Sequence, residues 1–233
     1  MANPASLDLY AKVEDLLGVM EVSPKLYAHY LLFLQTRDFE SLLDVGCGSG
    51  DFLLQMQNAL GIAKVKGIDL SPLMVEKTQA KGLDAHCVDL SKLDEKYDVI
   101  TAVFDMLNYL SPKALEDFGK AVKGHLNDGG IFLCDINTLY GFEEVAVGSF
   151  IVDDDERFLS IDSDYEEGVY TSEFTLFEKE KHCFKKSKEC IKQYLHSIEN
   201  LEKALGLTCL VNDEVRLYEL EEADKRFLVF ASL

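Results

Sequence analysis

The residues most able to do chemistry in this chain are a short glycine loop and the acid in front of it. An apolar run ends at Asp44, and three glycines follow at alternate positions: Gly46, Gly48 and Gly50. Glycine lets a turn adopt positive φ and lets bare backbone approach a ligand where a Cβ would clash. A helix behind such a turn offers unpaired N–H groups to a carboxylate or phosphate. The pattern predicts a strand, a tight turn and a helix that bind a nucleotide-like ligand.

The glycine spacing separates this loop from two common nucleotide-binding loops. The dinucleotide fingerprint G-x-G-x-x-G would place its last glycine where Asp51 stands, and no Lys-Ser or Lys-Thr pair follows as in a P-loop. The pattern Asp44-x-Gly46-x-Gly48-x-Gly50 resembles motif I of the class I S-adenosylmethionine-dependent methyltransferases. The resemblance implies S-adenosylmethionine as cofactor, bound by Asp44, Gly46, Cys47, Gly48 and Gly50.

Acids end the next two predicted strands. Strand Lys64–Ile68 ends at Asp69, about twenty residues beyond the glycines, where an acid meets the ribose hydroxyls in such folds. Strand Asp84–Val88 ends at Asp89, and in the family the matching acid accepts the adenine amino group while its neighbour packs against the ring. The resemblance therefore adds to the cofactor site Asp69, Leu70, Met74, Asp89 and Leu90.

A fourth strand, Tyr97–Val103, leads into a segment similar to motif IV of the family. Residues of that motif lie at the carboxyl end of the strand, beside the reacting methyl group. The resemblance implies that Phe104 contacts the cofactor and that the catalytic residues, which orient the acceptor, are Asp105, Asn108 and Tyr109. Asp135 and Asn137, at the end of a fifth strand, are the second choice.

The motif IV segment looks closest to a bacterial branch of small-molecule methyltransferases that includes N-methyltransferases of nucleotide-linked amino sugars. Members of this branch carry a β-insertion and an N-terminal Tyr-x-x-Trp segment that closes over the cofactor. Tyr27-x-x-Tyr30 replaces that segment here, so we expect Tyr27 and Tyr30 at the cofactor site. An upstream Tyr-Asp pair of the branch corresponds to Glu14-Asp15, which departs from the branch.

Strands and helices alternate as far as residue 147, which predicts an α/β fold with both sheet faces covered. We expect a Rossmann-like, doubly wound, seven-stranded, mostly parallel sheet with an antiparallel last strand. The cofactor-binding core comprises 1–147 and 197–233. It includes two N-terminal helices, Ala5–Leu17 and one capped by Ser23-Pro24.

Residues 148–196 break this alternation and show β-branched and aromatic residues at alternate positions. This pattern predicts a small inserted antiparallel β-sheet, which we expect to cover the substrate site. His182 and His196 could serve as bases there, and Tyr165 and Tyr170 could line the pocket. For each histidine a solvent-facing position is the simpler expectation.

The charge of the chain restricts its partners. It has 42 acidic and 23 basic residues and a formal net charge of −19, which repels nucleic acid and anionic membranes. We expect a neutral or cationic small-molecule methyl acceptor, no nucleic-acid or membrane partner, and a monomer or homodimer in the cytoplasm. Six scattered cysteines without a C-x-x-C pair predict reduced thiols and no metal site.

Three functions are compatible with these motifs. The first is methyl transfer to a nitrogen or oxygen of a small molecule. The second is another reaction on the same fold, by an aminopropyl transferase or an NAD-dependent enzyme, although the glycine spacing disfavours NAD. The third is noncatalytic binding of S-adenosylmethionine.

Overall fold

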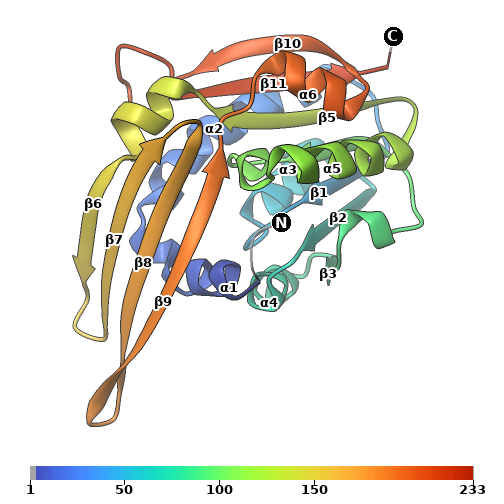
Figure 1. Ribbon diagram of the computed structural model, residues 1–233. Helices are drawn as coiled ribbons and strands as arrows, with labels where there is room; N and C mark the ends of the chain where they lie inside the picture. Colours follow the sequence, from blue (N-terminus) through green and yellow to red (C-terminus); the bar gives the residue numbers. More distant parts are fainter. Residues whose placement is uncertain (1–3, 233) are drawn as a thin grey trace.

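A seven-stranded sheet forms the centre of the computed structural model, which describes residues 4–232 (Figure 1). Its strand order is β10-β11-β5-β4-β1-β2-β3. Of these seven strands, β11 runs in the direction opposite to the other six. The strands are β1 (Ser41–Val45), β2 (Lys64–Asp69), β3 (Ala85–Cys87), β4 (Tyr97–Ala102), β5 (Leu126–Asn137), β10 (Thr208–Val215) and β11 (Lys225–Ala231). The predicted fold class is confirmed.

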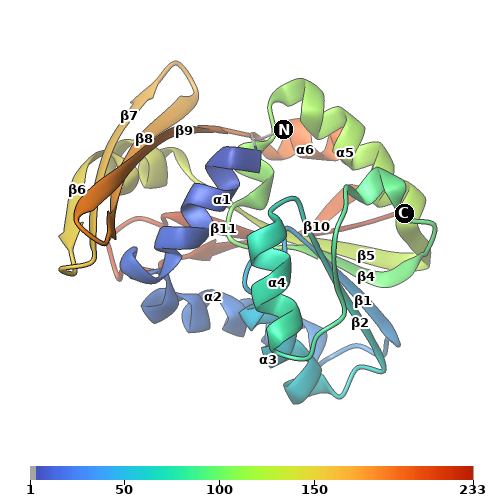
Figure 2. The same cartoon turned by 90° about the horizontal axis from the view of Figure 1, so that it is seen from below.

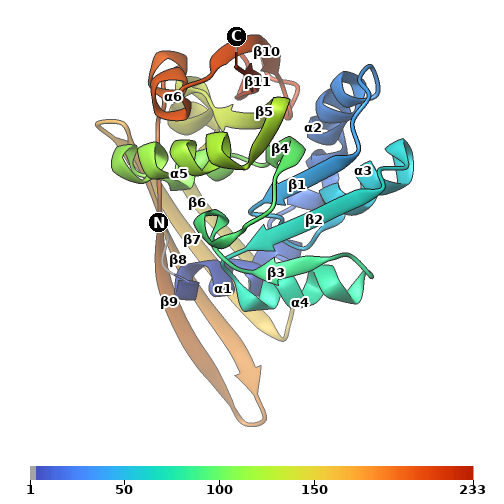
Figure 3. The same cartoon turned by 90° about the vertical axis from the view of Figure 1, so that its right-hand side faces the viewer.

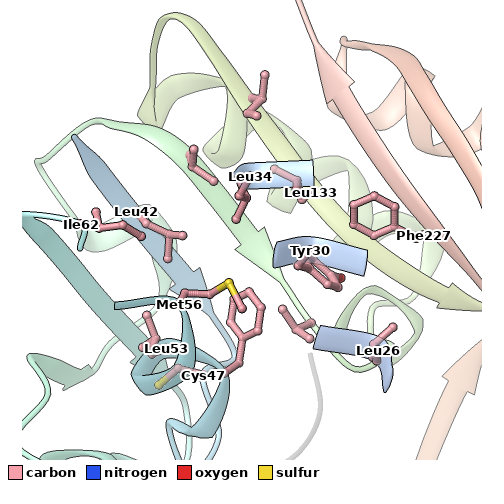
Figure 4. Packing of buried hydrophobic residues seen from close by; sticks show 14 of the residues in the cluster. Leu26, Tyr30, Leu34, Leu42, Cys47, Leu53, Met56, Ile62, Leu133 and Phe227 are labelled. Atoms are coloured by element: carbon pink, nitrogen blue, oxygen red, sulfur yellow. The ribbon is translucent and has the colours of Figure 1, made fainter. Parts of the chain in front are cut away.

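Helices cover both faces of this sheet. They are α1 (Pro4–Val13), α2 (Val19–Leu34), α3 (Asp51–Leu60), α4 (Pro72–Ala80), α5 (Pro112–His125) and α6 (Ile198–Leu205). Successive strand residues point to opposite faces, so Leu42 packs with α2 and α3 while Leu43 packs with α5 and α6. Figure 4 shows Tyr30 and Leu34 of α2 beside Phe227 and Leu133 of the sheet. Within residues 4–232 no helix is long and apolar enough to cross a membrane.

The first residues of α4 and α2 show how these helices begin. Ser71 accepts a hydrogen bond from the backbone N–H of Met74 at 3.3 Å and is the N-cap of α4. The predicted cap at Ser23 is wrong. Helix α2 begins earlier, at Val19, because Gly18 adopts φ +68° and reverses the chain after a short 3₁₀ turn at Glu14–Leu16. Pro24 therefore lies inside α2, where it removes one backbone hydrogen bond.

A second, four-stranded antiparallel sheet lies beside the first (Figure 1). It is formed by β6 (Gly148–Asp153), β7 (Arg157–Glu166), β8 (Val169–Glu180) and β9 (Cys183–Tyr194), in that order. A π-helix, Gly141–Ala146, leads from β5 into it. The hairpin of β8 and β9 extends beyond α1, as Figure 3 shows from the side. These strands lie within the predicted insertion.

Helix α1 is held between the inserted sheet and the core, as Figure 2 shows. Its Leu9 and Val13 are buried in an apolar cluster with Leu159, Phe174 and Ile191 of the inserted sheet. Toward the core, the hydroxyl of Ser71 donates to Asp8 at 2.5 Å. The position of α1 thus depends on both sheets.

Candidate functional site

A cavity of about 520 Å³ opens at the carboxyl ends of β1, β2 and β4. This is the edge of a parallel sheet where ligands bind in doubly wound folds. The glycine loop after β1 forms one wall, and the segment after β4 forms another. Helix α1 contributes Leu7 and Tyr10, so the N-terminal helix closes the cavity on a third side.

Most residues predicted to bind the cofactor line this one cavity. They come from α2, the glycine loop, the ends of β2 and β3, α4 and the segment after β4: Tyr27, Asp44, Gly46, Cys47, Gly48, Asp69, Leu70, Met74, Asp89, Leu90 and Phe104. Their convergence makes the cavity the candidate cofactor site. Their individual contacts to the cofactor stay predictions.

The glycine loop leaves space for a ligand at Gly48. This residue has φ +54°, and a Cβ built on it would meet no atom within 4 Å. The loop is held in place because the Gly48 N–H donates to Asp69 at 3.0 Å and the hydroxyl of Thr78 donates to the Gly48 carbonyl at 2.7 Å. The backbone thus forms a fixed, open cradle that suits the amino-acid end of S-adenosylmethionine.

Two carboxylates follow the loop along the cavity. Asp69 accepts the backbone N–H groups of Gly48 at 3.0 Å and Ser71 at 2.8 Å, and burial raises its pKa. Asp89 accepts the backbone N–H of Ser91 at 2.9 Å. A carboxylate offers about four lone-pair sites, so both acids keep capacity for ligand hydroxyl or amino donors. These two acceptors fit the hydroxyls of a ribose and the amino group of an adenine.

Asp44 is a buried acid of the cavity wall. It is 1% exposed, and the hydroxyl of Thr101 donates to it at 2.7 Å. Burial, with a smaller contribution from the nearby carboxylates of Asp69 and Asp135, raises the pKa of Asp44 to about 8, although the hydrogen bond from Thr101 lowers it. In the free protein this acid is therefore protonated at neutral pH, and a cationic ligand would favour its ionised form.

Binding of S-adenosylmethionine should consequently strengthen as the pH rises toward about 8, the pKa of Asp44, and then level off. Below that pH the protein must release a proton before Asp44 can face the ligand ammonium, which weakens the apparent affinity by at most about tenfold per pH unit. Calorimetry across this pH range measures the slope. In Asp44→Asn the contribution of this acid to the slope should be lost, and an unchanged slope in this variant would contradict the assignment.

Two residues predicted at the cofactor do not reach the cavity, and the structure corrects both. Tyr30 is completely buried, where its hydroxyl donates to Asp135 at 2.7 Å and its ring packs edge-on against Phe52 and Phe227. Gly50 precedes the first residue of α3 with φ +80°, and a Cβ there would lie 2.6 Å from Cγ2 of Thr78. Both residues support the walls of the cavity from behind.

Of the three residues predicted to be catalytic, one lines the cavity and two do not. Tyr109 lines the cavity, whereas Asn108 does not. Asn108 is fully buried, and its side chain donates to the Tyr194 carbonyl at 2.8 Å and accepts the Asn137 N–H at 3.0 Å. Asn108 therefore links the inserted sheet to β5, and the prediction that it orients the acceptor is corrected.

Asp105 lies outside the cavity lining, in a turn that the sequence did not predict. Phe104 and Asp105 have φ +58° and +49°, which non-glycine residues rarely adopt. The buried carboxylate of Asp135 holds this turn by accepting the N–H groups of Phe104 at 2.7 Å and Asp105 at 2.8 Å. Strained backbone of this kind occurs preferentially at functional sites.

Several residues around this turn and the cavity were missed from the sequence. Lys225 contacts Asp105 at 2.6 Å, and Gln193 donates to the same carboxylate. Glu14 lines the cavity, where burial raises its pKa and the hydroxyl of Ser49 donates to it at 3.3 Å. Two basic residues, Lys225 and Arg226, at the start of an apolar strand were a signal that could have singled out Lys225.

The inserted sheet does not supply the bases or the pocket wall predicted for it. His182 lies exposed in the turn between β8 and β9, and His196 is buried with its Nε2 near the carbonyls of Leu107 and Leu110. Tyr165 and Tyr170 stack on Phe142 at 5.5 Å instead of lining the cavity. These four residues have structural or solvent-facing positions.

Comparisons with known proteins agree with this geometry. Residues 42–130 match a family model described as a methyltransferase domain. A putative methyltransferase of Geobacillus sp. strain WCH70 is 26% identical over 134 residues, which are 53% of this chain and 53% of that protein. The chain thus spans about half the length of this curated relative.

Solved structures share the fold over nearly the whole chain. An S-adenosylmethionine-dependent methyltransferase from Clostridium acetobutylicum ATCC 824 has a TM-score of 0.76 at 23% identity and covers 96% of this chain and 99% of its own. CalS10 from Micromonospora echinaspora, an amino pentose methyltransferase solved with S-adenosylmethionine bound, has a TM-score of 0.66 at 20% identity, covering 91% and 94%. The family model confirms the resemblance to methyltransferases over residues 42–130, and the solved structures confirm the fold.

Proposed function

We propose that this chain, which carries a methyltransferase domain, transfers the methyl group of S-adenosylmethionine to an amine nitrogen of a small molecule. The observation that carries the proposal is the single cavity that joins the glycine loop to Phe104 and Tyr109. S-adenosylmethionine supplies an electrophilic methyl carbon on a positively charged sulfur. The task of the protein is then to align the acceptor with that carbon and to exclude water.

The charge of the cavity wall supports an amine as acceptor. Six acidic residues line the cavity, Glu14, Asp44, Asp51, Asp69, Asp89 and Asp117, of which Asp44 is protonated at neutral pH in the free protein, and the lining within the described residues contains no lysine, arginine or histidine. Such a wall attracts cations and repels anions. The amino pentose acceptor named for CalS10 belongs to the same chemical class.

Asp105 is the residue we assign to the acceptor. It directly precedes the segment that contains Tyr109, and its side chain is 14% exposed. An amine must lose its proton before it attacks the methyl carbon, and a carboxylate can hold the ammonium and accept that proton. Tyr10 and Tyr109 give the acceptor an aromatic surface from α1 and from the segment after β4.

A screen with product detection tests the proposal. Calorimetry with S-adenosylmethionine and NAD first establishes the cofactor, and mass spectrometry then follows methylated products from amines, hydroxylated metabolites and phosphorylated sugars. We expect binding of S-adenosylmethionine and methylation of amines. Preference for hydroxyl or multiply anionic acceptors would overturn the amine assignment. Tight cofactor binding without turnover of any acceptor class would favour the noncatalytic alternative.

Asp105→Asn should reduce product formation at least about tenfold, because the amide can no longer accept the acceptor's proton. Its affinity for S-adenosylmethionine should change less than about threefold, since Asp105 does not line the cofactor cavity. Asp162→Asn is the matched control, because Asp162 is an exposed acid of the inserted sheet that pairs only with the hydroxyl of Ser149 in the described hydrogen bonds. Equal losses in both variants would contradict a specific role for Asp105.

A further inference from the structure

A buried lysine lies behind the proposed acceptor-binding residue. We infer that Lys225 is a positioning residue for methyl transfer, because its ammonium fixes the Asp105 carboxylate and with it the left-handed turn of Phe104 and Asp105. The inference rests on the proposed function. Lys225 is the first residue of β11 and is 5% exposed. Lysine is almost never this buried unless its charge is paired.

The partners of Lys225 all belong to the site. Its Nζ lies 2.6 Å from Oδ1 of Asp105, 2.7 Å from Oδ1 of Asn137 and 3.6 Å from Oδ2 of Asp135. It also lies 5.8 Å from the ring centroid of Phe104. An ammonium has three donors, and here they face three acceptors. Lys225 therefore contacts both residues of the strained turn and the acid that holds their backbone.

Removal of this ammonium would leave two carboxylates close together without a counter-charge. Asp135 is fully buried and accepts both N–H groups of the turn, while the side chain of Asp105 is 14% exposed. Uncompensated buried charges are strongly unfavourable. The Asp105 carboxylate would move toward water, and the turn would lose the contact that keeps its left-handed backbone in place.

The inserted sheet holds the same carboxylate from the other side. Gln193 of β9 donates its side-chain N–H to Oδ2 of Asp105, opposite the oxygen that Lys225 contacts. Core strand and inserted sheet thus fix the two oxygens of one side chain. Since Phe104 of this turn lines the cofactor cavity, displacement of the turn would change the surroundings of the transferable methyl group.

A spectroscopic experiment tests this without knowledge of the acceptor. S-adenosylmethionine labelled with ¹³C at the methyl group is bound to the wild-type chain, to Lys225→Met and to Lys188→Met, and the bound methyl resonance is recorded. Lys188 is the matched control because its ion pair with Glu173 lies exposed on the inserted sheet. We expect a displaced or broadened resonance in Lys225→Met and a wild-type resonance in Lys188→Met.

A double variant distinguishes displacement of the turn from general misfolding. Lys225→Met combined with Asp105→Asn removes the unpaired charge, so its melting temperature should recover at least half of the loss seen in Lys225→Met, while its methyl resonance stays displaced. A wild-type methyl resonance in folded Lys225→Met or in the folded double variant would overturn the inference. Failure of the wild-type chain to bind S-adenosylmethionine would instead overturn the proposed function, which keeps the two outcomes distinguishable.

Discussion

Gly48→Val should abolish measurable binding of S-adenosylmethionine and leave the chain folded. Gly48 has φ +54° and lines the cavity, and a Cβ there points into open space. Valine would project its branched side chain into that space and would strain the backbone, because β-branched residues rarely adopt positive φ. We expect the dissociation constant to rise at least about a hundredfold, equivalent to about 2.7 kcal/mol.

Gly61→Val is the control that separates the effect of filling the ligand cavity from the effect of backbone strain. Gly61 ends α3 with φ +62°, and a Cβ there also meets no atom within 4 Å, but the residue does not line the cavity. The two variants should therefore lose similar amounts of thermal stability, while only Gly48→Val loses the ligand. Calorimetry and thermal unfolding measure both effects. Normal binding by a folded Gly48→Val variant would exclude the loop as the cradle.

Asp69→Ala should weaken binding of S-adenosylmethionine by at least about tenfold. Hydrogen bonds to a charged group contribute about 1.5–3 kcal/mol, and we predict two of them from the ribose hydroxyls. The variant also frees the N–H groups of Gly48 and Ser71, which Asp69 accepts at 3.0 and 2.8 Å. Part of the effect therefore arises from a looser glycine loop.

Asp98→Ala measures the structural part of this effect. Asp98 also accepts two backbone N–H groups, those of Glu40 and Ser41 at 3.0 Å each, but it lies at the amino-terminal end of β4, away from the cavity. Both variants should unfold at lower temperature than the wild-type chain, and Asp98→Ala should bind S-adenosylmethionine normally. Unchanged affinity in Asp69→Ala would refute the assignment of this acid to the ribose.

Local sequence patterns were sufficient to predict the main sheet and many of the residues along the candidate cofactor cavity. Strand ends, glycine turns and serine caps are signalled within a few residues, because backbone geometry and capping hydrogen bonds are short-range effects. Parallel topology then brings the carboxyl ends of the strands to one edge. Asp44, Asp69 and Asp89 therefore line one cavity although they lie on three strands of the chain.

Only the tertiary structure decided which polar side chains face the cavity and which support it. Tyr30 donates to Asp135 across 105 residues of sequence, Asn108 to Tyr194 across 86, and Lys225 to Asp105 across 120. No local pattern encodes such pairs, because each is selected by burial, where a polar group without a partner is costly. The sequence by itself determined the glycine loop and the acids at the strand ends, whereas packing between distant segments determined how the turn after β4 and its polar contacts are built.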